Sequence, residues 1–491
     1  MGEEGEILKV KYIILFLFLI FSTNKLKAES DSILDETFFI EEYKYSDEST
    51  LKDEIRVEQS LMVMSVDPIK MVDTYSKRII TLMYDTLFVV NGNGEIDSHL
   101  LDNYRWIEEN KLYLELKKGI KFHDNSYLKA QDVEKSLERL KKDGIITKIY
   151  NSIIGVEVID DHSLIINLNA RDGMLIKNLS NPIASIVKEE NGKLYGTGPY
   201  YMKSFNEGAL KLELFENSSV DKKQCFKNIT FTWELNPNQR VIKYLNGETD
   251  YIFDLYKEEI DKIREYNLLS EENIVKEEAI YDTIALTFGS KINYSLEEKR
   301  AIKEAIVQEV DSFFPQKIIK ANLSKIKNIY NLKEAKEKID ESGMKDREIS
   351  IMVLNTEYNM RVAKKVKKDL EDAGLKVTLL PHNMVSFYQK LYSKDYDTAI
   401  YNLTISKNSP AVSLEKIIMY DIVDEETISA LLPFLTLMRQ EKDTRNIEQI
   451  FDRILSLIDK SVLYIPIKHE LNYSIVKEED MERYNKSLKI N

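Results

Sequence analysis

The segment GIKFHDNSYLKAQDVEKSLERLKK, at 119–142, sets a histidine directly beside an aspartate, His123 and Asp124. These two residue types can exchange and stabilise protons together, so the pair raises the question of acid–base catalysis. The following Asn125 and Ser126 favour another interpretation, because Asp and Asn side chains bond nearby backbone amides and thereby form turns. We therefore predict that the pair is structural and that it belongs to a turn ahead of an amphipathic helix.

Catalytic motifs are missing from the rest of the sequence. There is no HExxH pair, no cysteine cluster and no Gly-x-Ser-x-Gly elbow. The stretch GTGPYY begins like a dinucleotide fingerprint, but Tyr201 stands at the third glycine position and Pro199 lacks an amide for phosphate. The histidines are scattered over positions His99, His123, His162, His382 and His469. We expect no enzyme, no cofactor and no metal centre; a hydrolase with an unrecognised site is the alternative from a different class.

Composition and charge limit the possible classes further. The chain has 491 residues, of which 43% are apolar and 10% aromatic, so it exceeds one ordinary domain and can bury large cores. Its formal net charge of −14 argues against a nucleic-acid partner, which requires a basic face. The single cysteine, Cys225, excludes an internal disulfide and a lipid anchor on a new N-terminal cysteine. We expect Cys225 to be a buried, inert thiol.

The first residues have the layout of a signal peptide. Lys9 and Lys11 precede the apolar run YIILFLFLIF, and a polar stretch ending in Ala28 follows it. A membrane-spanning helix needs roughly 20 apolar residues, which is about twice this run. We therefore predict that 1–28 is cleaved and that the protein is exported to a periplasmic space as a soluble protein without a lipid anchor. We interpret 29–50 as an acidic flexible leader, with a docking peptide as the alternative.

Beyond position 53, hydrophobic periodicity predicts alternating strands and helices, which is typical of an α/β fold. The predicted extended segments are 54–65, 111–122, 348–354, 375–380, a hairpin within 156–168 and the end of 454–476. The predicted helices are 130–142, 295–310, 332–343, 360–374 and one that starts near 74 and runs into an extended segment.

The order of these segments resembles that of the family 5 extracellular solute-binding proteins, which serve peptide, nickel and related ABC importers. The combination of KGIKFHDN and GTGPY carries the resemblance most specifically, and it extends over nearly all of the chain beyond the leader. Further similar segments are YLNGETDYIF, EEKRAIKEAIVQEVD, VAKKVKKDLEDAGLKVTLL, KDYDTAIYNLT and VLYIPI.

The resemblance implies a two-lobed periplasmic-binding-protein fold of type II, in the large peptide-binding class with an extra subdomain in lobe I. Lobe I is expected at 51–286 with an inserted subdomain at about 85–195, and lobe II at 287–460. The segment 461–491 is expected to return to lobe I. The chain would cross between the lobes near 284–288 and near 461–465, and a ligand would favour closure because it contacts both lobes only in the closed form.

The resemblance also suggests where a ligand binds, although the chain departs from its relatives there. Peptide-binding members carry an aspartate soon after the strand that here reads KDYDTAIYNLT, where it binds the peptide's ammonium; the corresponding loop YNLTISKNSPA has no carboxylate. A buried ammonium without a countercharge is costly, so another group must compensate for it. The residues that we predict to bind ligand, each of which has core packing or a plain loop as its alternative, are Met64, Ser65, Asp67, Tyr251, Phe253, Tyr281, Tyr401, Asn402, Ser406, Lys407 and Asn408.

The function that the resemblance implies is capture of a peptide or peptide-like solute and its delivery to ABC permease subunits, by a monomer. One alternative is a binding protein for a nickel chelate or another small solute. A bare ion would lack soft or imidazole ligands, so a metal would have to arrive chelated. A second alternative is a sensor or chaperone on the same fold, which adjacent permease and ATPase genes would argue against.

Overall fold

The structure is a computed structural model of the 491-residue chain. The residues that it describes are 53–71, 73–91, 95–144, 148–206, 208–220, 222–310, 330–345, 347–406, 414, 425–441 and 444–487. The predicted signal peptide and leader, and the predicted ligand residues Lys407 and Asn408, lie outside the described residues. Among the described residues, no helix is both long enough and apolar enough to cross a membrane.

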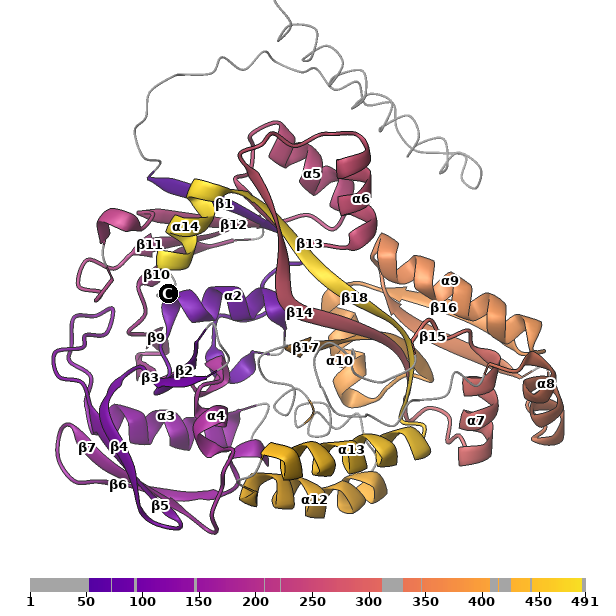
Figure 1. Cartoon of the computed structure of the whole chain (residues 1–491), viewed down its shortest axis with the longest axis horizontal. Coiled ribbons are helices and arrows are strands. Elements are labelled where there is room, and N and C mark those ends of the chain that lie inside the picture. Colours follow the sequence, from indigo (N-terminus) through magenta and orange to yellow (C-terminus); the bar gives the residue numbers. More distant parts are fainter. Residues whose placement is uncertain are drawn as a thin grey trace, which may run out of the picture.

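A ten-stranded mixed sheet runs through the molecule in the order β10-β11-β12-β1-β13-β18-β14-β17-β15-β16 (Figure 1). One side of it, which we call the lobe I side, consists of β1 (Glu54–Gln59), β10 (Tyr200–Phe205), β11 (Leu210–Leu214), β12 (Asn228–Trp233) and β13 (Tyr251–Leu255). The lobe II side consists of β15 (Glu348–Leu354), β16 (Lys376–His382) and β17 (Thr398–Ser406). The sheet therefore combines strands from chain segments that are far apart in the sequence.

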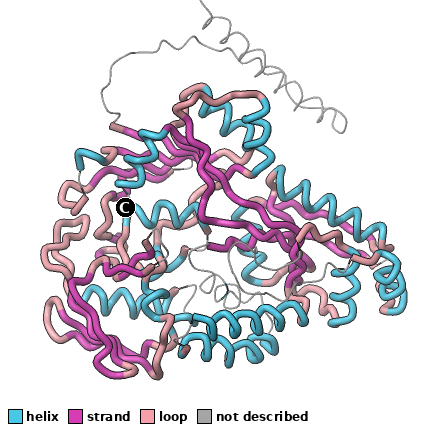
Figure 2. Tube along the Cα trace, in the orientation of Figure 1, coloured by secondary structure: helices cyan, strands magenta, loops and turns pink. Residues whose placement is uncertain are grey.

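Two long antiparallel strands join the two sides, β14 (Asn273–Phe288) and β18 (Tyr464–Lys477). They form a continuous band across the centre of the molecule (Figure 2). β18 pairs with β13 at its C-terminal end, and β14 pairs with β17 from Ile280 to Phe288. Their mutual register is interrupted twice, between Glu277 and Tyr281 and between Ile284 and Ala285. The crossing predicted at 284–288 lies in β14 and includes the second interruption; its position stays a prediction.

A separate four-stranded sheet, in the order β4-β5-β7-β6, carries the predicted hairpin. Its strands are β4 (Leu101–Glu108), β5 (Lys111–Leu116), β6 (Ile153–Val158) and β7 (Ser163–Leu168). Short hairpins β2 (Phe88–Val90) with β3 (Ile96–Ser98) and β8 (Lys188–Glu190) with β9 (Lys193–Tyr195) lie nearby in the chain. These elements fall within the subdomain predicted at about 85–195; the predicted boundaries themselves stay a prediction.

Helices cover the sheets on both sides (Figure 1). On the lobe I side they are α2 (Thr74–Met83), α3 (Ala130–Asp143), α4 (Leu175–Leu179), α5 (Pro237–Leu245), α6 (Lys257–Glu265) and α14 (Glu478–Ser487). The others are α7 (Leu296–Ala305), α8 (Leu332–Glu341), α9 (Glu357–Asp372), α10 (Met384–Ser393), α12 (Glu425–Gln440) and α13 (Thr444–Lys460). Short 3₁₀ helices occur at Pro68–Lys70, Lys148–Tyr150, Pro182–Ala184 and Lys222–Gln224.

Three predicted elements end at least five residues earlier than their periodicity indicated, because tertiary contacts take over. The extended segment predicted over 111–122 ends as a strand at Leu116, and the amide of Lys117 donates to the carbonyl of Leu100 at 2.9 Å. The helix predicted over 295–310 ends at Ala305, and the amide of Glu309 instead donates to the carbonyl of Ile467 in β18 at 2.7 Å. The strand predicted over 54–65 ends at Gln59, and the amide of Ser60 donates to the Asp254 carboxylate at 2.9 Å.

The His123–Asp124 pair is part of the architecture, as predicted. The His123 ring accepts the amide of Gly196 through Nδ1 at 3.2 Å and donates through Nε2 to the carbonyl of Gly198 at 3.0 Å. Asp124 accepts the Ser126 amide at 2.9 Å and pairs with Lys188 at 2.5 Å. These contacts join the FHDN turn to the GTGPY segment. Cys225 is buried, at 4% exposure, as predicted; its inertness stays a prediction.

Candidate functional site

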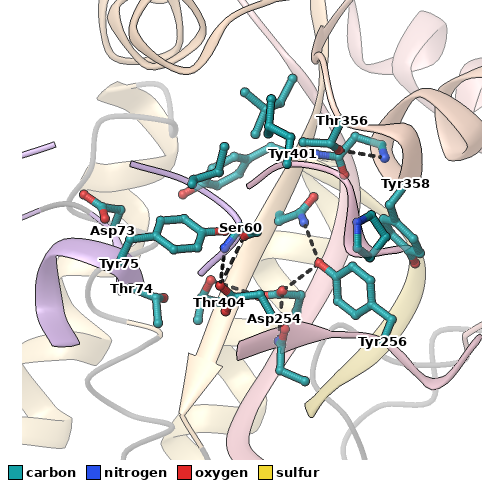
Figure 3. Close-up of a pocket in the computed structure, with 18 of the residues that line it drawn as sticks. Ser60, Asp73, Thr74, Tyr75, Asp254, Tyr256, Thr356, Tyr358, Tyr401 and Thr404 are labelled. Carbon is teal, nitrogen blue, oxygen red and sulfur yellow. Dashed lines mark hydrogen bonds between the residues drawn. The ribbon is translucent and has the colours of Figure 1, made fainter. Parts of the chain in front are cut away.

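A cavity of about 210 Å³ lies where the lobe I side, the lobe II side and the two joining strands meet (Figure 3). The lobe I side contributes residues that follow β1 and β13 and residues of α2. The lobe II side contributes the end of β15, the start of α9, part of α10 and the residues 400–404 of β17. Asp282 of β14 and Asn472 of β18 complete the lining. The walls therefore come from both sides of the sheet.

The lobe I wall is organised around an ion pair between Arg78 and Asp254. The guanidinium donates to both carboxylate oxygens, at 2.5 and 3.1 Å, and both side chains are about nine-tenths buried. Ser60 adds a backbone amide at 2.9 Å and its hydroxyl at 3.2 Å. Burial alone would raise the pKa of Asp254, but the charge and hydrogen bonds of Arg78 lower it below its usual value. Asp254 is therefore ionised and fully paired.

The backbone of Asp254 is also held in an unusual conformation. Its φ is +62°, in the left-handed region that non-glycine residues seldom adopt, although Asp tolerates it better than most. Arg240, which is only 2% exposed, donates to the Asp254 carbonyl at 2.6 Å and to the carbonyl of Glu234 at 2.6 Å. These contacts fix the residue at the cavity wall, where its carboxylate meets Arg78.

Asp282 occupies a different setting, in the joining strand β14. Its carboxylate is 8% exposed and accepts hydrogen bonds from the amide of Asn472 at 3.0 Å, the hydroxyl of Thr404 at 2.9 Å and the hydroxyl of Tyr256 at 3.2 Å. All three donors are neutral. Burial, together with the charge of Asp254, raises the pKa of Asp282 above its usual value, against the effect of these hydrogen bonds. The salt bridges of the described residues include none to Asp282.

Aromatic side chains and an amide lie next to this carboxylate. The rings of Tyr256 and Tyr358 are 4.3 Å apart between centroids, and the Tyr358 hydroxyl donates to Glu470 at 2.8 Å. Asn402 donates its Nδ2 to the Tyr256 hydroxyl at 3.5 Å, while its buried Oδ1 has no hydrogen-bond partner among the described residues. Figure 3 shows Tyr75 and Tyr256 entering from opposite sides with their hydroxyls toward the middle.

Lys77 supplies a positive charge to the same lining. Its side chain is half-buried, and the ion pairs among the described residues do not include it. Burial lowers its pKa, and the neighbouring Arg78 lowers it further. A lysine in such a place can bind a carboxylate or another anionic group of a ligand.

Of the residues predicted to bind ligand, Tyr401 and Asn402 line the cavity. Met64, Ser65, Asp67, Tyr251 and Phe253 are not among its lining residues. Tyr251 stacks on Phe253 at 4.2 Å within the core, and Asp67 pairs with Arg139 at 2.7 Å. Tyr281 and Ser406 lie in β14 and β17, and nothing is described of their side chains. A role in binding for these seven residues stays a prediction.

Four residues of the cavity were not predicted from the sequence: Asp282, Tyr256, Arg78 and Asp254. A signal for Asp282 was present, since an acidic residue opens the otherwise apolar and hydroxylic run DTIALTF. The other three come from separate segments whose proximity depends on the tertiary fold. Within the part of the chain that the structure describes, no group of three or more His, Cys, Asp or Glu side chains is placed to hold a metal ion.

Solved structures with the same architecture define the class of fold. The protein DppA of Helicobacter pylori, solved in complex with the peptide STSA, superposes with a TM-score of 0.77 over 86% of this chain and 94% of that one, at 18% identity. NikA of Staphylococcus aureus, solved in complex with Ni(L-His)2, gives a TM-score of 0.74 over 87% and 95%, at 18% identity. The chain has the two-lobed α/β fold of the solute-binding proteins, as predicted.

The family is identified by sequence. Residues 95–417, more than half of the chain, match the model of the bacterial extracellular solute-binding proteins, family 5. The chain belongs to this family. Among curated relatives it is 26% identical to the nickel-binding protein NikA of Staphylococcus aureus over 46% of each chain. It is 23% identical to the glutathione-binding protein GsiB of Escherichia coli K12 over 49% of this chain and 51% of that one. The chain thus spans about half the length of the curated relatives it matches.

Proposed function

We propose that this protein is the substrate-binding component of an ABC importer, and that it captures a peptide or peptide-like solute between its two lobes. The observation that carries the proposal is the cavity itself, which is lined from both sides of the sheet and by the two joining strands. A solute in this position would contact both lobes at once, so it would favour the closed arrangement. The closed protein would then deliver the solute to permease subunits in the membrane.

The chemistry of the lining supports a polar, charged solute of modest size. Carboxylates, the half-buried Lys77 and several tyrosines face the same space, so ammonium, carboxylate and apolar parts of one molecule can each find a partner. Tyrosine rings provide flat apolar surfaces together with a hydroxyl, which suits varied ligands. The charge pattern is that of a site for zwitterions such as peptides.

A nickel chelate or another small solute is the second candidate. It is favoured by the relatives named nickel-binding and by the solved complex with Ni(L-His)2. The described residues hold no cluster that could replace the chelator, so the metal would enter with its own ligands. A sensor or chaperone on the same fold would use the same cavity and differ only in its partner.

Native mass spectrometry tests the proposal directly. The full-length protein would be expressed in a host grown in rich medium and purified gently. Its intact mass would be measured, and it would then be denatured to identify what is released. We expect a series of small peptides in stoichiometric amounts. A single chelate mass with a nickel isotope pattern would move the assignment to the second candidate. A protein that carries nothing and shows no thermal stabilisation with peptides or chelates would contradict solute capture.

A further inference from the structure

The inference concerns Asp282 and what neutralises its charge, and it rests on the proposed capture of a solute in the cavity. Asp282 lies in β14, one of the two strands that join the lobes, and its carboxylate lines the cavity. It is more than nine-tenths buried and is hydrogen-bonded only to neutral groups on β17, β18 and the residue preceding α6. A buried carboxylate with no countercharge is costly to the folded protein.

The other carboxyl groups of the described lining are stabilised by an ion pair or by a helix N-terminus, and Asp282 has neither. Asp254 has Arg78. Asp73 caps the N-terminus of α2 and accepts the Ser76 amide at 2.7 Å, and Glu259 accepts the Tyr256 amide at 2.9 Å at the start of α6. Glu357 is exposed in the first turn of α9. Among the described lining residues, Asp282 alone has neither an ion pair nor a helix N-terminus.

Five tyrosines line the same cavity as this carboxylate, and we call them the tyrosine cage: Tyr75, Tyr256, Tyr358, Tyr388 and Tyr401. They come from α2, the start of α6, α9, α10 and β17, and so from both lobes. Burial raises the pKa of every one of them, and the negative charge of Asp282 raises it further. The tyrosines are therefore neutral, and they offer ring faces and hydroxyls but no positive charge.

Aromatic rings that line the same cavity as a carboxylate can attract a cationic nitrogen, the rings through their quadrupoles and the carboxylate through its opposite charge. Asn402 adds a second acceptor, because its buried Oδ1 has no partner among the described residues and its Nδ2 lies 3.5 Å from the Tyr256 hydroxyl that Asp282 binds. We propose that Asp282, inside the tyrosine cage, binds a cationic nitrogen of the solute.

The assignment specifies the solute class more closely than the proposed function does. The solute carries a protonated amine, placed against the joining strand β14. Because the tyrosine cage includes residues of both lobes, the cationic group would contact both of them. The bound nitrogen would supply the countercharge that Asp282 does not receive from any ion pair of the described residues.

The test uses yeast extract as the probe in three forms: untreated, N-acetylated and reductively dimethylated. Acetylation removes the positive charge of amines, whereas dimethylation retains it. The full-length protein, freed of bound solute, is titrated with each extract, and native mass spectrometry gives the bound masses and the extract concentration at half-saturation. We expect untreated and dimethylated extract to yield bound solutes, and acetylated extract to lose them. An exhaustively methylated extract then shows whether the charge of the amine is enough for binding or whether its N–H groups are needed.

Two variants complete the test. Asp282→Asn removes the charge and should raise the extract concentration at half-saturation on the order of 30-fold or more. Asp397→Asn is the matched control, because Asp397 is equally buried, accepts the Tyr294 hydroxyl at 2.6 Å and lies outside the cavity lining. The extract concentration at half-saturation of Asp397→Asn should equal that of the wild type. Thermal unfolding of both variants shows whether the folded state is retained.

The pH dependence gives a readout on the wild type that does not depend on how Asp282→Asn folds. Protonation of Asp282 abolishes its attraction for a cation, and its pKa is raised, so binding should weaken on acidification at a higher pH than an ordinary aspartate would cause. The groups that face Asp282 are the tyrosine cage, Asp254 with Arg78, and Glu470 with Lys468. The tyrosines stay neutral over this range, and each of the two carboxylates is paired with a cation.

The outcomes separate the two proposals. If the wild type binds solutes from acetylated and untreated extract equally, or if folded Asp282→Asn binds as the wild type does, the assignment of Asp282 is wrong while solute capture stands. If the wild type binds nothing from any extract, solute capture fails and the assignment of Asp282 fails with it.

Discussion

At the scale of single residues, two aspartates of the cavity show how partners decide the role of a carboxylate. Asp254 has a guanidinium at 2.5 Å and a lowered pKa, whereas Asp282 has three neutral donors and a raised pKa. Asp254 is a structural residue of the lobe I wall whose charge is already balanced by Arg78. Asp282 has no ion-pair partner among the described residues, and we propose that a solute supplies one.

The ion pair of Arg78 with Asp254 should contribute strongly to stability. Replacing Arg78 by Met leaves the carboxylate buried and unpaired, which we expect to lower the free energy of unfolding by about 3–5 kcal/mol. Lys257→Met serves as the control, because the Lys257–Asp261 pair is exposed on α6 and should matter little. Urea unfolding measures both. An Arg78 variant as stable as the control would refute this account of the wall.

The same pair predicts a pH dependence with a defined sign. The pKa of Asp254 is lowered in the folded state, so its contribution is fully present above the unfolded pKa and is lost as the pH falls through the folded pKa. The stability advantage of the wild type over Asp254→Asn should therefore shrink on acidification. Unfolding measured across the acidic range checks this; an advantage that grows toward low pH would be inconsistent with the pairing.

At the scale of elements, the segments that carried the family resemblance are those with local chemistry. The FHDN turn and the GTGPY segment contain the groups that bind each other, so their structural role could be inferred from residue types. The cavity could be predicted only in part, through Tyr401 and Asn402. Asp282 and Arg78 were missed because β14 and α2 meet only in the folded chain. The end of the helix at Ala305 was missed because a bond to β18 decides it.

Gly198 offers a test of how tightly the GTGPY segment packs. A Cβ at Gly198 would lie 2.5 Å from the Met83 carbonyl carbon and 2.7 Å from the Leu82 carbonyl oxygen, so Gly198→Ala requires a backbone shift. We expect a loss of about 1–3 kcal/mol in the free energy of unfolding. Gly155→Ala is the matched control on β6, where a Cβ would meet nothing within 4 Å. Equal unfolding midpoints for the two variants would show that the segment is not confined.

At the scale of the whole molecule, β14 and β18 are the connection through which the two sides of the sheet can move. They pair along most of their length, and their register is interrupted between Glu277 and Tyr281 and between Ile284 and Ala285, on either side of Asp282. A solute at Asp282 would thus lie at the joint itself and would contact groups from both lobes. The α/β class and the two-lobed fold could be predicted from the sequence, since they depend on periodicity and segment order. Ligand identity could not, because it depends on side chains drawn from nine separate segments.

The central claim is that a solute binds between the lobes and draws them together, and the distance between the lobes tests it most directly. Spin labels at Gln239→Cys on α5 and Lys364→Cys on α9 report that distance by pulsed electron paramagnetic resonance. Both positions are exposed, and the buried Cys225 should stay unlabelled. Labels at Gln239→Cys and Lys211→Cys, both on the lobe I side, form the control. The account predicts that yeast extract shortens and narrows the distribution between lobes and leaves the control unchanged. A distribution between lobes that does not change while native mass spectrometry shows bound solute would contradict it.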